Sequence, residues 1–379
     1  MDIYLDNSAT TRPCDEAVAA CVYAMETEYG NPSSLHRRGF AAERLIDTAA
    51  KQLAAALSCD PAELIFTSGA TESNNLAIFG AAEASARRGR TIVTTAIEHP
   101  SVLEAVRQLE ERGYTVRRLL PNGDGVYTAQ QFADAVDGDT VLVSCMMVNN
   151  EMGLILPVPE IAKAVKRKNP GVLVHVDAVQ GFLKLPIRLK NSAVDLLSVS
   201  GHKVRAPKGI GALYIRRGVR ILPRTFGGGQ QNGLRPGTES VPLISAFGAA
   251  VEVQRTRLTE ELERYRQLRT RLEEAADGVE GLRVNFSGGH CAPHIVSLSA
   301  HGIRSEVMLH FLEQYDISVS SGSACAKGAH SYVLTALGLS DRTADETIRV
   351  SFGAETTPDM IDELVGRMAQ GLATLAKQR

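Results

Sequence analysis

Short apolar runs rich in Val, Ile and Leu alternate along the chain with longer segments of helical periodicity. The runs bounded by turn residues predict strands at 63–67, 90–95, 140–145, 172–176, 196–200 and 211–215. Helices are predicted between most of them, for example over 101–112 and 159–168. Because strands that alternate with helices are typical of βαβ units, we expect an α/β fold with a mainly parallel sheet.

A long charged helix, predicted over 243–276, separates this sheet from a second α+β segment that runs to residue 379. We therefore expect two domains. The large domain is predicted over 15–255, and a smaller α+β domain is predicted from 1–14 together with 256–379. The hydrophobic fraction of 44% and the charged fraction of 22% are ordinary for a globular protein of this length.

Charge and composition exclude several classes of protein. The formal net charge is -2, with Lys and Arg scattered among Asp and Glu, so we expect neither nucleic acid nor an anionic membrane as a partner. The N-terminus lacks a basic region followed by an apolar stretch, and no apolar run approaches the ~20 residues that span a bilayer. We therefore expect a cytoplasmic protein.

The cysteines are widely spaced and form no Cys-x-x-Cys pair, which argues against a zinc or iron-sulfur site, so no metal is expected. In a reducing compartment we expect free thiols. The six positions are Cys14, Cys21, Cys59, Cys145, Cys291 and Cys325.

An aspartate and a lysine carry the clearest chemical signal. Asp177 ends the apolar run Val172–Val176, and Lys203 follows the strand-like run 196–200 among Ser, Gly and His. A pyridoxal 5'-phosphate enzyme needs such a pair: the lysine holds the cofactor as a Schiff base, and the carboxylate keeps the pyridine nitrogen protonated. The alternatives are a satisfied structural carboxylate and a surface lysine.

Further polar motifs follow the predicted strands, at the edge where open α/β sheets bind ligands. Residues 67–75 lead from a strand into a helix, and the backbone N–H groups and the Thr71 hydroxyl there suit a phosphate or a simple helix cap. His99 can stack on a flat ring and move protons, or cap a helix. Asn149 and Asn150 can bind a phenolic oxygen or a carboxylate, or form an Asn-rich turn.

Three more polar residues are predicted at the same site because of their spacing in the sequence. Gln180 lies three residues after Asp177, so both side chains can reach one ligand. Ser200 and His202, just before Lys203, are placed to hold the phosphate from the opposite side.

Two residues near the C-terminus suit substrate chemistry. Cys325 lies in a stretch of small residues, which we expect to be mobile and to expose its thiol. Arg349 lies in a predicted strand, where its planar guanidinium can bind a substrate carboxylate through two hydrogen bonds or serve as a structural ion-pair partner.

The chain resembles the cysteine desulfurase family, of the NifS-like and IscS-like kind, within the class V aminotransferases of fold type I. The resemblance covers nearly the whole length, through motifs at 4–11, 29–36 and 349–353. It implies that Lys203 binds the cofactor covalently and His99 stacks on its ring. It also implies phosphate contacts from Ala70, Thr71, Ser200, His202 and, from the partner subunit of a homodimer, Thr238. Asn149 and Gln180 would contact the ring hydroxyl.

The implied reaction removes sulfur from L-cysteine. Cys325 matches the cysteine that receives the sulfur as a persulfide, Arg349 and Asn149 would bind the substrate, and L-alanine is the second product. Lys203 would move the α-proton, and His99 would deprotonate the substrate thiol or donate a proton on product release. The Ser320–Cys325 pattern resembles the branch with a longer catalytic loop, which passes sulfur directly to acceptor proteins in iron-sulfur cluster assembly or in tRNA or cofactor thiolation.

Alternatives remain open at the level of the sequence. A selenocysteine lyase or another class V aminotransferase-type enzyme would keep Asp177 and Lys203 without requiring Cys325. A non-catalytic sulfur carrier of the same fold would lack the cofactor altogether.

Overall fold

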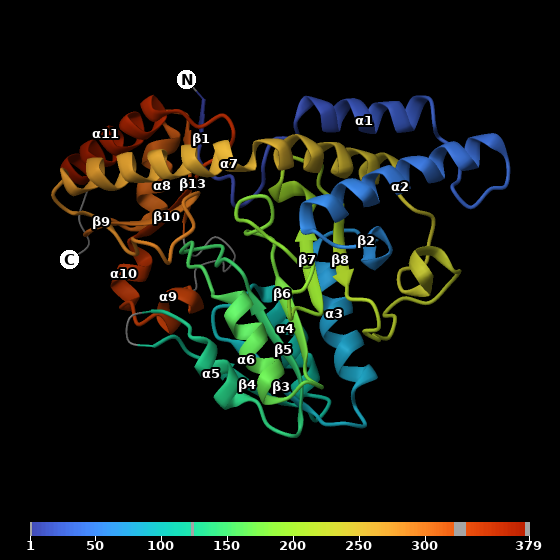
Figure 1. Ribbon diagram of the computed structural model, residues 1–379. Coiled ribbons are helices and arrows are strands. Elements are labelled where there is room, and N and C mark those ends of the chain that lie inside the picture. Colours follow the sequence, from blue (N-terminus) through green and yellow to red (C-terminus); the bar gives the residue numbers. More distant parts are fainter. Residues whose placement is uncertain (1, 123–124, 322–330, 376–379) are drawn as a thin grey trace.

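The computed structural model describes residues 2–122, 125–321 and 331–375. Its centre is a seven-stranded sheet with the strand order β2-β8-β7-β6-β5-β3-β4 (Figure 1). Only β8 runs antiparallel to its neighbours within this sheet. The strands are β2 (Leu64–Thr67), β3 (Thr91–Thr95), β4 (Thr115–Leu119), β5 (Thr140–Met146), β6 (Leu173–Asp177), β7 (Leu196–Ser200) and β8 (Gly211–Ile215).

Helices cover both faces of the sheet. Helices α3 (Ala70–Ala84) and α4 (Pro100–Glu110) pack their apolar sides on one face. The other face is covered by α2 (Arg37–Leu57), α5 (Ala129–Ala135), α6 (Val158–Lys168) and the first half of α7 (Val241–Asp277). Helix α1 (Asp15–Glu26) lies along α7 (Figure 1). This three-layer arrangement confirms the predicted α/β fold with a mainly parallel sheet.

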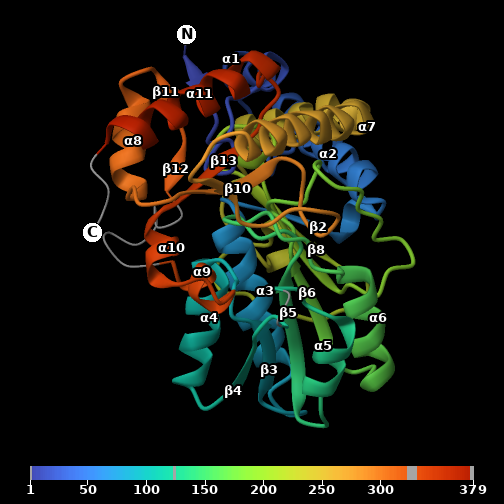
Figure 2. The same cartoon turned by 90° about the vertical axis from the view of Figure 1, so that its left-hand side faces the viewer.

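A second hydrophobic core lies around the small sheet β12-β13-β10-β9, beside α8 and α11 (Figure 2). It contains the second half of α7 and also the start of the chain, because β1 pairs in parallel with β11. The predicted boundary at residues 255–256 stays a prediction. The remaining elements are β1 (Ile3–Tyr4), β9 (Leu282–Val284), β10 (Ile295–Ala300), β11 (Ile317–Ser318), β12 (Ser320–Ser321), β13 (Thr347–Ser351), α8 (Ser305–Glu313), α9 (Tyr332–Ala336), α10 (Asp341–Asp345) and α11 (Pro358–Thr374).

A buried histidine ties the central strands together just below their carboxyl ends. His175 of β6 hydrogen-bonds to Ser144 of β5 through Nδ1 (2.8 Å) and to Ser198 of β7 through Nε2 (3.0 Å). Burial lowers the pKa of His175 to about 3, so the ring is neutral at physiological pH. Three neighbouring strands are thereby held in register next to the point where Asp177 and Ser200 leave the sheet.

No helix in the described ranges is long and apolar enough to cross a membrane. The five cysteines in those ranges are all free; Cys14, Cys145 and Cys291 are buried, whereas Cys21 and Cys59 are partly exposed. Cys325 lies outside the described residues.

Candidate active site

A cavity of about 730 Å³ opens at the carboxyl ends of β6 and β7. This volume is in the range of pockets that enclose a cofactor or a small ligand. The structure brings most of the predicted site residues to its wall. Those residues are Ala70, Thr71, His99, Asp177, Gln180, Ser200, His202, Lys203 and Arg349.

Asp177 ends β6 and is 6% exposed. Its carboxylate accepts a hydrogen bond from Asn74 Nδ2 at 2.8 Å and one from the backbone N–H of Val179 at 3.0 Å. Asn74 comes from α3 and is fully buried, so it fixes the orientation of the carboxylate from the neighbouring layer. A buried carboxylate held in this way is suited to pair with a cationic ring nitrogen.

Lys203 ends a short 3₁₀ turn, Gly201–Lys203, that directly follows β7. Its ammonium group donates hydrogen bonds to the backbone oxygens of Ser8 at 2.6 Å and Ala9 at 2.7 Å. Gln180 Nε2 also donates to the oxygen of Ser8, at 2.9 Å. The N-terminal segment therefore positions the lysine at the cavity, and this part of the site was not predicted from the sequence.

The N-terminus of α3 forms an anion cradle in the same cavity. Gly69 is the N-cap residue and supplies no side-chain cap, so the N–H groups of the first turn remain available to a ligand. Its φ of 152° is a conformation that favours glycine. Ala70 and Thr71 lie in this turn, and Ser200 and His202 line the same cavity. Their arrangement suits a phosphate group.

His99 is the N-cap residue of α4, and its ring lines the cavity. Its Nδ1 accepts from the backbone N–H of Ser101 at 3.1 Å and lies 2.9 Å from the Ser101 hydroxyl. Because Nδ1 accepts the backbone N–H, the neutral ring carries its proton on Nε2, and the Ser101 hydroxyl can also donate to Nδ1. Burial, reinforced by Lys203, lowers the pKa of His99 despite the opposing effect of Asp177. The ring is therefore mainly neutral, with its proton on Nε2.

The structure selects Asn150 rather than Asn149 as the cavity residue. Asn149 is fully buried, donates to the oxygen of Ile97 at 3.0 Å, and accepts from the N–H groups of Glu151 and Met152. Its side-chain oxygen is therefore bound within the turn that follows β5, and its amide is bound to the segment that follows β3. Asn150 lines the cavity, and its side-chain oxygen has no hydrogen-bond partner among the described residues. Asn150, rather than Asn149, is therefore the residue that can contact a ligand in this cavity.

Arg349 lies in β13 and is 8% exposed. Its guanidinium donates to Asp6 Oδ1 at 2.7 Å and to the backbone oxygen of Asn150 at 3.0 Å. Its Nε is a buried donor without a partner within the described ranges, and the residue lines the cavity. A carboxylate would satisfy this donor.

Two other predicted residues, besides Asn149, are not seen at the cavity. Thr238 is exposed and does not line the cavity of its own chain. Cys325 lies outside the described residues. Its described neighbours flank the site: Ser320 lines the cavity, and Ser331 donates to Glu151 Oε2 at 2.5 Å.

These donors fit pyridoxal phosphate: an amine for the aldehyde, a carboxylate for the pyridine nitrogen, an imidazole for the ring face and a helix N-terminus for the phosphate. The fold and the site thus define an enzyme of the fold type I pyridoxal phosphate class. The family model "Aminotransferase class-V" matches residues 3–364, and the chain belongs to this family.

Curated relatives make the comparison more specific. The chain is 42% identical to a "Cysteine desulfurase" of Trichormus azollae, over 97% of this chain and 92% of that protein. It is likewise 42% identical to "Cysteine desulfurase IscS" of Escherichia coli, over 99% of this chain and 94% of that protein.

Two solved structures are also similar to this chain. A "NIFS-LIKE PROTEIN" superposes with a TM-score of 0.94 at 37% identity, covering 99% of this chain and 100% of that one. A structure described as "SspA in complex with cysteine" superposes with a TM-score of 0.79 at 32% identity, covering 92% and 98% of the two chains.

Proposed function

We propose that the protein is a cysteine desulfurase, which converts L-cysteine to L-alanine and leaves the sulfur as a persulfide on Cys325. The observation that carries this proposal is the convergence of Lys203, Asp177 and Arg349 on one cavity, in a chain with cysteine desulfurase relatives along nearly its whole length. Pyridoxal phosphate, when bound, supplies the electron sink that makes the substrate α-proton acidic.

The remaining steps, which are substrate binding and proton transfer, are assigned to residues of the chain. Arg349 binds the substrate carboxylate and Asn150 lies beside it, which orients the amino acid in the cavity. Lys203, once released from the oxygens of Ser8 and Ala9 and deprotonated, moves the α-proton. His99 exchanges a proton with the substrate or the product through Nε2, because Nδ1 is occupied by Ser101.

Sulfur transfer needs a thiolate that reaches the substrate. The thiolate of Cys325 forms a bond to the substrate sulfur, the carbon–sulfur bond breaks, and its electron pair passes to carbon, which takes a proton to give alanine. Three residues lie between Ser321 and Cys325, so the Cα atoms of the two residues can be at most about 14 Å apart. The flanking residues Ser320 and Ser331 both lie near the cavity, which supports this role.

The homodimer and the sulfur acceptor are further parts of the proposal. The exposure of Thr238 on its own chain is compatible with a contact to the phosphate in a partner subunit. We expect a protein acceptor in iron-sulfur cluster assembly or in tRNA or cofactor thiolation, and a cytoplasmic location.

The test is incubation of the purified protein with pyridoxal phosphate and L-cysteine. Mass spectrometry should show one added sulfur on the Cys325 peptide, with alanine formed in equal amount. Borohydride should fix the cofactor to Lys203 in the wild type and not in Lys203→Ala. An unmodified Cys325 peptide, or cofactor attached elsewhere, would refute the proposal.

A further inference from the structure

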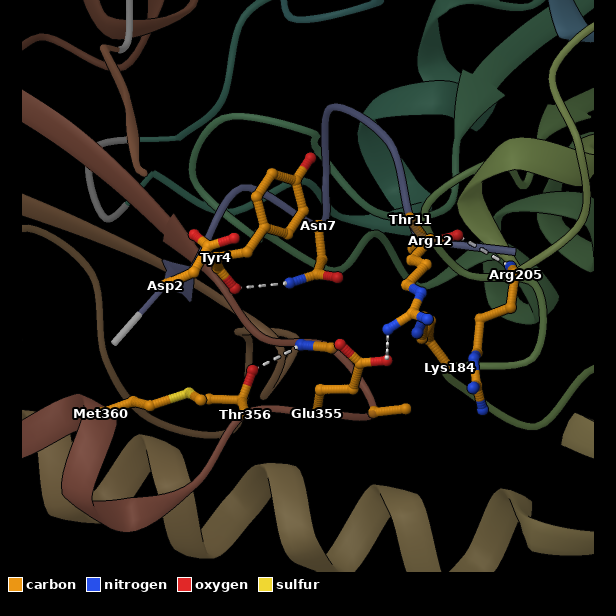
Figure 3. A pocket seen from close by; sticks show the side chains of 12 residues that line it. Asp2, Tyr4, Asn7, Thr11, Arg12, Lys184, Arg205, Glu355, Thr356 and Met360 are labelled. Atoms are coloured by element: carbon orange, nitrogen blue, oxygen red, sulfur yellow. Dashed lines mark hydrogen bonds and ion pairs between the residues drawn. The ribbon is translucent and has the colours of Figure 1, made fainter. Parts of the chain in front are cut away.

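A second, smaller cavity of about 100 Å³ lies behind the wall of the active site. The segment 6–12 separates the two cavities: Asp6, Ser8, Ala9 and Thr10 line the larger one, whereas Asn7, Thr11 and Arg12 line the smaller. Figure 3 shows Lys184 and Arg205 on one side of the smaller cavity and Asp2 and Tyr4 on the other.

Lys184 is an unusual residue to find at this place, because it is only 7% exposed. Its ammonium donates to the hydroxyl of Tyr265 at 3.3 Å and lies 5.1 Å from the centre of the Tyr265 ring. Burial, together with Arg205 and Arg264 and against Glu261, lowers the pKa of Lys184 to about 8. The amine is therefore still largely charged at neutral pH.

Three basic residues, Arg12, Lys184 and Arg205, and two carboxylates, Asp2 and Glu355, line this cavity. Glu261 is bound by Arg264 at 2.8 Å, and Glu355 at the cavity rim is bound by Arg12 at 3.3 Å (Figure 3). Neither Lys184 nor Arg205 makes an ion pair within the part of the chain that the structure describes. Unpaired buried cations are costly unless a counter-ion joins them.

The backbone at Arg205 gives a second, independent indication. Arg205 has a φ of 58°, a left-handed conformation that is strained for a residue with a side chain. It is held there by its N–H, which donates to Thr11 Oγ1 at 2.8 Å. Strain of this kind is concentrated at ligand clamps and active sites. Here it accompanies a half-buried guanidinium that lines the same cavity as Lys184.

We propose that this cavity is a binding site for a small oxyanion, such as phosphate or sulfate, held between the ammonium of Lys184 and the guanidinium of Arg205. Its volume exceeds the ~30 Å³ that one water takes in the liquid, so an anion of a few heavy atoms fits. The guanidinium offers two parallel N–H donors to two oxygens of such an anion, and the ammonium offers a third donor.

Hydrogen bonds of Thr11 connect this site to the active site. Thr11 donates from both its N–H and its hydroxyl to the backbone oxygen of His202, at 2.9 Å each, while it accepts from Arg205. The backbone of the residue that holds the anion is therefore linked through Thr11 to the turn that carries Lys203. The anion site itself uses residues outside the cofactor cavity, so it does not depend on the proposed reaction.

The test is isothermal titration of the cofactor-loaded protein with inorganic phosphate. Sodium gluconate keeps the ionic strength constant and is too large to enter the cavity. Loading the cofactor first keeps phosphate out of the α3 cradle. We expect one phosphate per chain in the wild type, with affinity at least tenfold weaker in Arg205→Gln and Lys184→Met. Arg220→Gln, an exposed position away from the cavity, serves as the matched control and should bind as the wild type does.

Thermal unfolding supplies the second readout. At a phosphate concentration 100-fold above the dissociation constant, the unfolding midpoint of the wild type should rise by about 3–5 °C, and that of Arg205→Gln by less than one third of this. In gluconate alone, Lys184→Met should be at least as stable as the wild type, because it removes a buried charge. No phosphate binding to the wild type, or equal affinity in wild type and Arg205→Gln, would overturn the proposal.

Discussion

Replacement of Arg349 by lysine tests how the site recognises its substrate. The guanidinium has five N–H donors, of which two serve Asp6 and the oxygen of Asn150. The Nε donor is buried without a partner within the described ranges, so it and a neighbouring N–H remain for the substrate carboxylate. A lysine ammonium has three donors. If two of them keep the contacts to Asp6 and Asn150, one is left for the substrate.

The expected loss follows from this count. Arg349→Lys removes one charge-assisted hydrogen bond to the carboxylate, worth about 1.5–3 kcal/mol. Since 1.4 kcal/mol corresponds to a factor of ten, kcat/KM for L-cysteine should fall by about 10- to 150-fold. Because the bond is made in the bound substrate as well as in the transition state, most of the loss should be a rise in KM.

The assay measures alanine formation from L-cysteine and from L-cysteine amide, which has no carboxylate. The loss should be large for L-cysteine and close to absent for the amide. Arg283→Lys, an exposed arginine on β9 of the same small sheet, is the control and should leave both substrates unaffected. An equal loss on both substrates would show that Arg349 acts only on the fold, and the reasoning would be refuted.

Three further predictions concern other residues. Asp177→Asn should change the unfolding free energy by no more than about 1 kcal/mol, because Asn74 Oδ1 lacks a partner among the described residues and can accept a hydrogen bond from the new amide. The kcat should fall about 100- to 1000-fold. A variant with wild-type activity would contradict this. Burial raises the pKa of Glu98 from its usual 4.5 to about 8, so between these pH values the folded state binds more protons than the unfolded state. The unfolding free energy of the wild type should therefore fall relative to that of Glu98→Gln as pH rises from 4.5 to 8, by up to about 1.4 kcal/mol per pH unit. Urea unfolding at several pH values measures this, and the same pH dependence in both proteins would exclude it. Cys325→Ala should abolish persulfide formation from L-cysteine, as measured by mass spectrometry, and any selenium release from selenocysteine that remains would identify lyase activity.

The strands of the large sheet could be predicted because their burial leaves a strong sequence signal. β7 and β8 have the predicted bounds, and the ends of β2, β3, β5 and β6 differ from them by one residue. The polar residue that ends a buried run, Asp177, was therefore placed correctly at the sheet edge. The strand β4 was not predicted, because none of its five residues is buried and its sequence includes two arginines.

The rest of the site depends on contacts that have no local signal. Lys203 is held by backbone oxygens, which any residue type supplies, so Ser8 and Ala9 carry no pattern that marks them. Arg349 is paired with Asp6, 343 residues away in the sequence. The choice between Asn149 and Asn150 depends on which of the two points into the turn, and spacing alone cannot decide it.

The small sheet and the N-terminal segment also have a consequence for biosynthesis. Arg349 is on β13, and Ser351 in the same strand hydrogen-bonds to the backbone of Ser8 and Leu5. A ribosome therefore releases the N-terminal wall of the cavity first and the strand that completes it almost last. Until that strand has emerged, the nascent chain lacks Arg349, the residue proposed to bind the substrate carboxylate, and a polypeptide terminated before it lacks this contact.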